Sequence, residues 1–382
     1  MATNLTINGT DLDTLFIPKS AIKLPPITGK LWAWGQNAGG NLGQGDTSDR
    51  YSPVQVGSLA DWKSIAGGSN HTLATKTDGT LWVWGSGYKG ALGLGESWGN
   101  RVSPTQIGTL TDWSLVSCGK YFCVAIKTDG TMWSWGGDII DGIGVLGVGD
   151  TIYRSSPVQI GSLTTWSSVT CGETHSIATQ TDGSLWAWGS NSWYELGLGS
   201  NWGAWVPARV GSLTDWKLVS GRTKSMQAIK TDGTLWGWGA NNYGQLGLGD
   251  IFTVSVPVQV GSLNSWQSVS VANRQTVATK TDGTLWGWGG NAYGQLGLGD
   301  RTNTSSPVQV GSRTDWNTTS CGNHHSLAIK TDGSMWSFGY NGSGQLGLGD
   351  TTHRSSPVQV GSLTNWKLIT SGYWGWVLAL SQ

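Results

Sequence analysis

Carboxylate side chains recur in this sequence at a fixed spacing, and a ring of them could bind calcium. Six Asp-Gly pairs follow one another about every 50 residues. Asp is also the residue that tight turns favour before Gly. We therefore interpret the six as turn residues that lie around one rim: Asp78, Asp129, Asp182, Asp232, Asp282 and Asp332. A second set closes Gly-rich loops and is interpreted as loop-capping: Asp46, Asp150, Asp250, Asp300 and Asp350.

Histidine and cysteine are the other candidate metal ligands. His71, His175 and His325 share one position of the repeat, where other copies carry Phe122, Ser225, Gln275 and Trp376. A position that accepts such different side chains is not a conserved ring of ligands. We expect each histidine to be hydrogen-bonded within its own repeat rather than bound to a metal.

Three of the four cysteines, Cys118, Cys171 and Cys321, share another repeat position. Cys123 follows Cys118 by five residues, which on one continuous strand would point the two thiols to opposite faces. We expect buried core thiols rather than a disulfide or a metal site.

No set of residues indicates catalysis. The sequence contains no Gly-x-Ser-x-Gly elbow, no phosphate-binding loop that ends in Lys-Ser/Thr, and no close pair of carboxylates within an apolar run. We therefore predict a protein that is not an enzyme, with no catalytic residue, cofactor or metal ion.

The elements that hold these residues are short antiparallel strands. In the copy from Trp266 to Val310, runs that alternate apolar with small or polar residues flank Asp282-Gly283, a pair typical of a type I′ hairpin turn. The segment Leu285–Gly289, a Gly-rich loop and a Pro-Val-Gln-Val stretch follow, and proline suits an outer strand. Each repeat is thus predicted to be a four-stranded sheet.

A lone small sheet cannot bury its faces, and radial stacking of such sheets solves this in a β-propeller. Three large side chains recur in each unit, and we expect them to pack between neighbouring sheets. The first set is Trp32, Trp82, Trp133, Trp186, Trp236, Trp286 and Trp336; the second is Trp34, Trp84, Trp135, Trp188, Trp238, Trp288 and Phe338; the third is Trp62, Trp113, Trp166, Trp216, Trp266, Trp316 and Trp366.

The two ends of the repeat region complement each other. The first repeat begins at Leu31 without inner strands, and the last ends after Val377–Leu380 without outer strands. The fold class is therefore predicted to be all-β: a seven-bladed propeller of four-stranded antiparallel blades, closed by pairing of N- and C-terminal strands. Residues 29–382 form the propeller, and residues 1–28 an extended arm.

The motifs resemble the regulator of chromosome condensation repeat over roughly Leu31 to the end. Gly239–Asp250 (GANNYGQLGLGD) and Gly289–Asp300 (GGNAYGQLGLGD) carry its loop almost whole. The resemblance implies a seven-bladed propeller. The family includes a chromatin-bound nucleotide exchange factor, a plant ultraviolet photoreceptor and many proteins of unknown role, so it implies fold more strongly than function.

Light reception is not expected from this resemblance. The photoreceptor carries tryptophans directly after a glycine of each blade, each followed by arginine. The matching positions here hold no tryptophan: Ser69, Lys120, Glu173, Thr223, Asn273, Asn323 and Tyr373. Arg274 is the one arginine at the following position.

Composition excludes several classes of partner. Charged residues are only 12% of the chain and balance to zero, and no basic stripe suggests nucleic-acid binding. No apolar run is long enough to span a membrane, and no secretory signal is recognisable. We expect no nucleic acid and no membrane span, and a cytoplasmic location unless the chain is part of a virion.

The N-terminal arm is a candidate anchor. Leu12, Leu15, Phe16 and Ile17 form a small apolar patch before several prolines, and the opening resembles that of some tailed-phage virion proteins. The arm is either an anchor that inserts these residues into other virion subunits, or a leader or strap without that role.

The repeats also differ on their loops, where function tends to lie. The third residue after the last Gly of each loop is large and apolar in four consecutive blades: Trp98, Ile152, Trp202 and Phe252. Tyr153, Trp193, Tyr194 and Trp205 lie nearby. This arc predicts a partner-binding face, unless the side chains pack locally over the loops.

The sequence thus favours a non-enzymatic interaction or structural propeller, most concretely a phage virion-associated protein that presents its loops to a neighbouring subunit, a host surface glycan or a receptor. The alternative is a regulatory propeller that binds a small GTPase or another intracellular protein. A hydrolase or lyase with a site in the central channel has no supporting residues.

Overall fold

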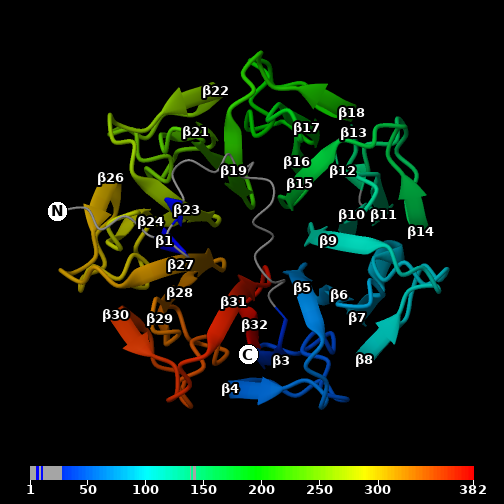
Figure 1. The fold of residues 1–382 in the computed structure, drawn as a ribbon, viewed down its shortest axis with the longest axis horizontal. Helices are drawn as coiled ribbons and strands as arrows, with labels where there is room; N and C mark the ends of the chain where they lie inside the picture. Colours follow the sequence, from blue (N-terminus) through cyan, green and yellow to red (C-terminus); the bar gives the residue numbers. More distant parts are fainter. Residues whose placement is uncertain (1–5, 8–9, 12–27, 138, 141–142) are drawn as a thin grey trace.

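The strands of the chain form a ring of small sheets. The computed structural model describes residues 6–7, 10–11, 28–137, 139–140 and 143–382. Within these residues seven four-stranded antiparallel sheets surround a central axis (Figure 1). The all-β, seven-bladed prediction is confirmed.

Each blade runs from an inner strand near the axis to an outer strand at the rim. Three blades, in chain order, are β5 (Trp62–Gly67), β6 (His71–Lys76), β7 (Leu81–Ser86) and β8 (Asn100–Gln106); β9 (Trp113–Cys118), β10 (Phe122–Lys127), β11 (Met132–Gly136) and β14 (Arg154–Gln159); and β15 (Trp166–Cys171), β16 (His175–Gln180), β17 (Leu185–Gly189) and β18 (Ala204–Arg209).

The next three blades keep the same order. They are β19 (Trp216–Gly221), β20 (Ser225–Lys230), β21 (Leu235–Gly239) and β22 (Val254–Gln259); β23 (Trp266–Val271), β24 (Gln275–Lys280), β25 (Leu285–Gly289) and β26 (Thr304–Gln309); and β27 (Trp316–Cys321), β28 (His325–Lys330), β29 (Met335–Gly339) and β30 (Arg354–Gln359).

The seventh blade is made from both ends of the chain, as predicted. It orders β31 (Trp366–Ser371), β32 (Trp376–Ser381), β3 (Lys30–Gly35) and β4 (Arg50–Gln55). β3 and β32 pair along their whole length, from Lys30 opposite Ser381 to Gly35 opposite Trp376. The ring is therefore closed by hydrogen bonds between its first and last strands.

Small elements accompany the ring: β1 (Thr6–Ile7) pairs with β2 (Thr10–Asp11), and β12 (Ile139–Ile140) pairs with β13 (Ile143–Gly144) in the longer loop after β11. A short 3₁₀ turn, η3, spans Tyr88–Gly90. No helix in the described part of the chain is both long and apolar enough to span a bilayer.

The apolar core is divided into clusters between adjacent blades. One contains Trp62 and Trp84 of the β5–β8 blade together with Leu378 of the composite blade. The Trp62 ring meets those of Trp82 and Trp84 at 6.1 and 5.8 Å between centroids, near edge-to-face. The same packing recurs around the ring, so the prediction that these tryptophans lie between sheets is confirmed.

The Asp-Gly turns differ from the predicted type I′ geometry. Gly283 has φ +78°, but the described non-glycine residues with positive φ are Lys89 and Tyr194, so Asp282 does not adopt it. Gly283 N–H donates to Lys280 O and Lys280 N–H donates to Thr284 O. The connection is thus a type I turn followed by a left-handed Gly, which a three-residue hairpin loop requires.

The carboxylates of these turns are bound within the turns, as the turn interpretation expects. The Thr284 hydroxyl and N–H both donate to Asp282 Oδ1, at 2.6 and 2.9 Å. These hydrogen bonds hold the pKa of Asp282 below its ordinary value. The Trp286 indole N–H in turn donates to the Thr284 hydroxyl, so each turn is tied to a core tryptophan.

Arg222 crosses the middle of the ring. It stands where most blades carry glycine, directly after β19. Its Nη1 donates to Cys321 O at 2.8 Å and its Nη2 to Ser371 O at 3.0 Å, in two other blades. The guanidinium also lies 4.4 Å from the Tyr373 ring centre. Burial lowers the pKa of Arg222.

Candidate functional site

The face that carries the Gly-rich loops holds the residues singled out from the sequence. Strand direction alternates within a blade, so the loop between its third and fourth strands lies on the same side as the turn between its first and second. We call this side the loop face. The Asp-Gly turns lie on the opposite side.

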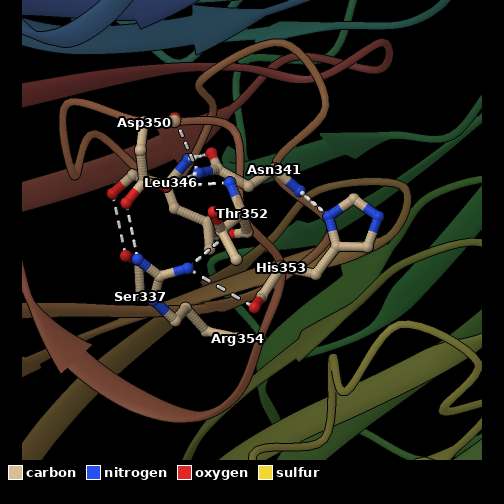
Figure 2. Close-up of polar contacts among 7 residues, drawn as sticks. All are labelled: Ser337, Asn341, Leu346, Asp350, Thr352, His353 and Arg354. Atoms are coloured by element: carbon tan, nitrogen blue, oxygen red, sulfur yellow. Dashed lines mark hydrogen bonds and ion pairs between the residues drawn. The ribbon is translucent and has the colours of Figure 1, made fainter.

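An asparagine and an aspartate fix the backbone of each typical loop (Figure 2). In the β29–β30 loop, Asn341 Nδ2 donates to the Asp350 carbonyl and carboxylate, and Asn341 Oδ1 accepts from Leu346 N. Asp350 Oδ1 also accepts from Thr352 N, and Asp350 Oδ2 pairs with Arg354 at 2.6 Å. The loop-capping interpretation of this aspartate is confirmed.

Hydrogen bonding and charge both act on the Asp350 carboxyl. The N–H of Thr352 and the Arg354 guanidinium hold the pKa of Asp350 below its ordinary value of 3.8. The aspartate pins the amide of the third residue after the last Gly. The backbone of this residue is therefore fixed, while its side chain extends into solvent. The side chain at this position is free to vary from blade to blade.

In four consecutive blades that position carries a large apolar side chain, and it is exposed. The exposed fractions are 64% for Trp98, 62% for Ile152, 79% for Trp202 and 73% for Phe252. The alternative of burial under the loops therefore does not apply to these four. We call these four residues, together with Tyr153, Trp193, Tyr194 and Trp205, the aromatic arc.

The remaining predicted residues surround these four. Tyr153 follows Ile152, Trp205 lies on the outer strand β18, and Trp193 lies in the β17–β18 loop; all three are exposed. Tyr194 is half-buried and has φ +62°, a left-handed conformation that non-glycine residues rarely adopt. The structure brings all eight residues to the loops or outer strands of consecutive blades.

Cations stack on aromatic rings beside the arc, which the sequence alone did not indicate. Lys224 Nζ lies 4.4 Å from the Trp193 ring centre, and the Arg274 guanidinium lies 4.5 Å from that of Tyr243. These four side chains line a pocket of about 280 Å³ with Gln245. Within the described residues, neither Lys224 nor Arg274 has a carboxylate within ion-pair distance, although the charge of Lys224 partly offsets the rise that burial causes in the pKa of Glu195.

A repeat position explains this arrangement. Lys224, Arg274, His324 and Trp374 all stand immediately before or within two residues of the second strand of their blades. His324 packs against Tyr293 of the preceding blade at 5.2 Å, as Lys224 and Arg274 pack on rings of theirs. Aligning the copies at this position would have found the pocket residues, whereas the alignment on the last Gly of each loop found the arc.

The His71 and cysteine predictions need correction. Cys118 ends β9 and Cys123 is near the start of β10, so the two lie opposite each other in register, with their sulfurs 3.3 Å apart. The prediction that they face opposite ways was wrong because a turn separates them. His71 was expected to bond within its own blade, but its Nε2 lies 3.3 Å from Cys123 Sγ of the next.

The cysteine side chains are buried, and burial acts on their pKa values. Burial raises the pKa of the Cys118 thiol, but hydrogen bonds with Cys123 and His71 outweigh this and bring it to about 6. Burial raises the pKa of the Cys171 thiol to about 12, because its hydrogen bonds with Ser117 and Ser176 do not offset the loss of solvent. The expectation that all four cysteines are buried is confirmed.

Two predictions cannot be followed in the structure. The anchor residues Leu12, Leu15, Phe16 and Ile17 lie outside the described residues. The division into an arm at 1–28 and a propeller at 29–382 stays a prediction for the same reason.

Comparison with known families gives a consistent result along the chain. The profile of the RCC1-like domain matches residues 141–376. The regulator of chromosome condensation (RCC1) repeat matches residues 28–75 and 78–126. The first match alone covers more than half of the chain.

Two curated relatives come from Arabidopsis thaliana. The chain is 34% identical to the ultraviolet-B receptor UVR8 over 181 residues, which cover 46% of this chain and 40% of the receptor. It is 31% identical to the mitochondrial RCC1 domain-containing protein RUG3 over 191 residues, 47% of this chain and 42% of that protein. The matches thus span less than half the length of these relatives.

Among solved structures, Prp20p from Saccharomyces cerevisiae superimposes with a TM-score of 0.82. The alignment covers 94% of this chain and 92% of that chain at 18% identity. At this identity the likeness supports the fold alone. Prp20p itself is described as having binding properties to Gsp1p and histones.

Proposed function

Because the chain belongs to the family of RCC1-like domains, we propose that it is a non-enzymatic interaction propeller that binds a protein partner on its loop face. The observation that carries this proposal is the aromatic arc. Its four central side chains are between 62% and 79% exposed on consecutive blades. Large exposed apolar side chains gathered on one face favour a binding role, and Trp is enriched at the centres of binding sites.

The pocket beside the arc indicates what the partner offers. Lys224 and Arg274 bring two positive charges to aromatic walls formed by Trp193 and Tyr243. A partner that inserts an Asp or Glu there would pair with both cations, while apolar side chains beside it cover Trp202 and Phe252. The proposed partner is therefore a protein surface or segment in which carboxylates alternate with apolar residues.

A small GTPase is the specific partner class we favour, in line with a regulatory role inside the cell. The family relationship supports this candidate more than a virion role, since none of the relatives described above is named as a virion protein. Attachment to a virion through residues 1–28, with a glycan or receptor on the loop face, is the second candidate.

Light reception is not part of the proposal, despite the likeness to an ultraviolet-B receptor. Of the residues that follow the blade glycine, Lys120 forms an ion pair with Glu173 at 2.8 Å, and Tyr373 lies against Arg222. No tryptophan occupies this position in any blade.

Affinity capture from the source cells tests the proposal. The bait variant Trp202→Thr/Phe252→Thr should lose the captured partner, and Lys224→Gln/Arg274→Gln should weaken its capture at least tenfold, since each charged contact is worth about 1.5–3 kcal/mol. The matched control is Thr302→Ala/Thr352→Ala, which changes the same loop position in blades outside the arc. Capture that survives both arc and pocket variants would overturn the proposal.

Nucleotide release separates the partner classes. The partner identified by capture is loaded with a fluorescent guanine nucleotide, and release is followed with and without the propeller. Acceleration by wild type but not by Trp202→Thr/Phe252→Thr supports the GTPase candidate. A captured partner that is a virion subunit, lost when residues 1–28 are removed, would favour the second candidate instead.

A further inference from the structure

Three potential metal ligands from two blades converge in the core. Cys118 Sγ and Cys123 Sγ lie 3.3 Å apart, and His71 Nε2 lies 3.3 Å from Cys123 Sγ. All three donor atoms fall within 4.8 Å of one another. The residues are buried, with exposed fractions of 5% or less. His71 begins β6 and the cysteines face each other across β9 and β10.

The other blades lack this combination at the same positions. Cys171 faces Ser176, and Cys321 faces Ser326, at 3.6 and 3.7 Å between sulfur and hydroxyl oxygen. His175 meets the thioether of Met226. His325 has no side-chain hydrogen-bond partner at either ring nitrogen. Two thiols and an imidazole meet only at the junction of the β5–β8 and β9–β14 blades, within the described residues.

A glycine makes room for the imidazole. A Cβ at Gly68 would overlap the His71 imidazole, as one at Gly172 would overlap that of His175, so glycine is the residue compatible with the present ring position. When the ring proton is on Nδ1, the Nε2 lone pair can point toward the sulfur. Histidine binds metals in this neutral form.

We propose that His71, Cys118 and Cys123 form a site for a thiophilic divalent cation of the Zn²⁺ type. Two thiolates and a neutral imidazole carry two negative charges, so Zn²⁺ leaves the buried site electrically neutral. The two thiol protons pass to solvent as the metal binds. The proposal is independent of the loop face and of the function proposed for it.

The present geometry is close to what such a cation needs. Zn–S bonds of about 2.3 Å at a tetrahedral angle place two sulfurs roughly 3.7 Å apart, so the pair would separate by a few tenths of an ångström. The Ala91 carbonyl oxygen lies 3.6 Å from Cys123 Sγ and the Ala66 carbonyl oxygen 3.9 Å from Cys118 Sγ. A carbonyl or a water molecule can complete the coordination. The metal would link two blades that otherwise meet through apolar contacts and hydrogen bonds.

Refolding of the full chain provides access to the buried site and tests the proposal. The reduced protein is refolded with Zn²⁺ or with a chelator and freed of excess metal. Its zinc content is then measured by elemental mass spectrometry. We expect about one Zn²⁺ per chain and a melting temperature higher by roughly 2–5 °C than that of the chelated protein. Refolding with Co²⁺ should give the absorption bands of a tetrahedral thiolate site.

The repeat itself supplies the matched variants. Cys123→Ser recreates the Cys–Ser pair of two other blades and should abolish Zn²⁺ binding, and His71→Gln, the residue of another blade, should weaken it strongly. Cys321→Ser is the control and should bind as wild type does. Should the variants fail to refold, the Co²⁺ spectrum of wild type alone decides, because absence of thiolate bands contradicts the site.

Other outcomes would overturn the proposal. Wild type that refolds without retaining Zn²⁺ contradicts it, and so does equal binding by Cys123→Ser. Loss of two thiols with a mass lower by two hydrogens would instead reveal a Cys118–Cys123 disulfide. Stoichiometric uptake of Cu(I) but not Zn²⁺ would contradict the divalent assignment.

Discussion

Two loops of the same face share a skeleton and differ in what they display. In the β29–β30 loop Asn341 binds Asp350 and Leu346, and in the β17–β18 loop Asn191 binds Ser200, Trp202 and Leu196 in the same manner. The first loop displays Thr352 and an Asp350–Arg354 pair, whereas the second displays Trp202. The asparagine fixes the backbone, and the displayed residue is therefore free to carry function.

The largest effect should come from the shared asparagine. Asn341→Ala and Asn191→Ala each remove three hydrogen bonds from a fully buried side chain. They also leave a leucine N–H without a partner, so each should lower the free energy of unfolding by about 2–4 kcal/mol. Denaturant titration measures this. A clear loss in only one of the two loops would break the comparison.

The second effect is smaller: the stability that each loop contributes should depend differently on pH. The folded-state pKa of Asp350 is lowered, first by the Thr352 N–H and also by Arg354. Its contribution to stability is present above its ordinary value of 3.8 and is lost as pH falls through the lowered value.

The matched variant is Asp350→Asn. It should flatten the decline of the melting temperature below about pH 4 relative to wild type. Ser200→Ala, at the matching position of the other loop, should leave that decline unchanged, since serine does not titrate. An unchanged slope in Asp350→Asn would contradict the inference.

The smallest effect on stability should come from the displayed residues. Trp202→Thr and the reciprocal Thr352→Trp should each change the free energy of unfolding by less than about 0.5 kcal/mol, because both side chains lie outside the core. Thermal melts of the two variants check this. A loss of about 2 kcal/mol in Trp202→Thr would indicate that the indole is part of the packing, and would remove the basis for the proposed partner face.

Much of the architecture could be predicted because the sequence repeats it. The spacing of Asp-Gly pairs indicated the blades, the incomplete ends indicated the closure, and the recurring tryptophans indicated the packing between sheets. The hairpin type was wrong because Asp-Gly favours type I′ only in two-residue loops. Here the pairing of Lys280 with Thr284 leaves three residues in the loop.

The sites were harder to predict because their parts come from different blades. Lys224 and Trp193, or His71 and Cys123, are far apart in sequence and meet only when blades pack side by side. Periodicity locates a residue within its own sheet but does not say which side chain faces it from the next. The aromatic arc was found because neighbouring copies differ at a single aligned position.

Arg222 ties three blades together across the centre of the ring. Its side chain reaches from one blade to the carbonyls of two others and lies against Tyr373. A peptide tail or a small molecule that entered the centre at this level would meet the Arg222 side chain and its hydrogen bonds. If one of these three blades moved relative to the others, the movement would stretch or break the hydrogen bonds that Arg222 makes with them.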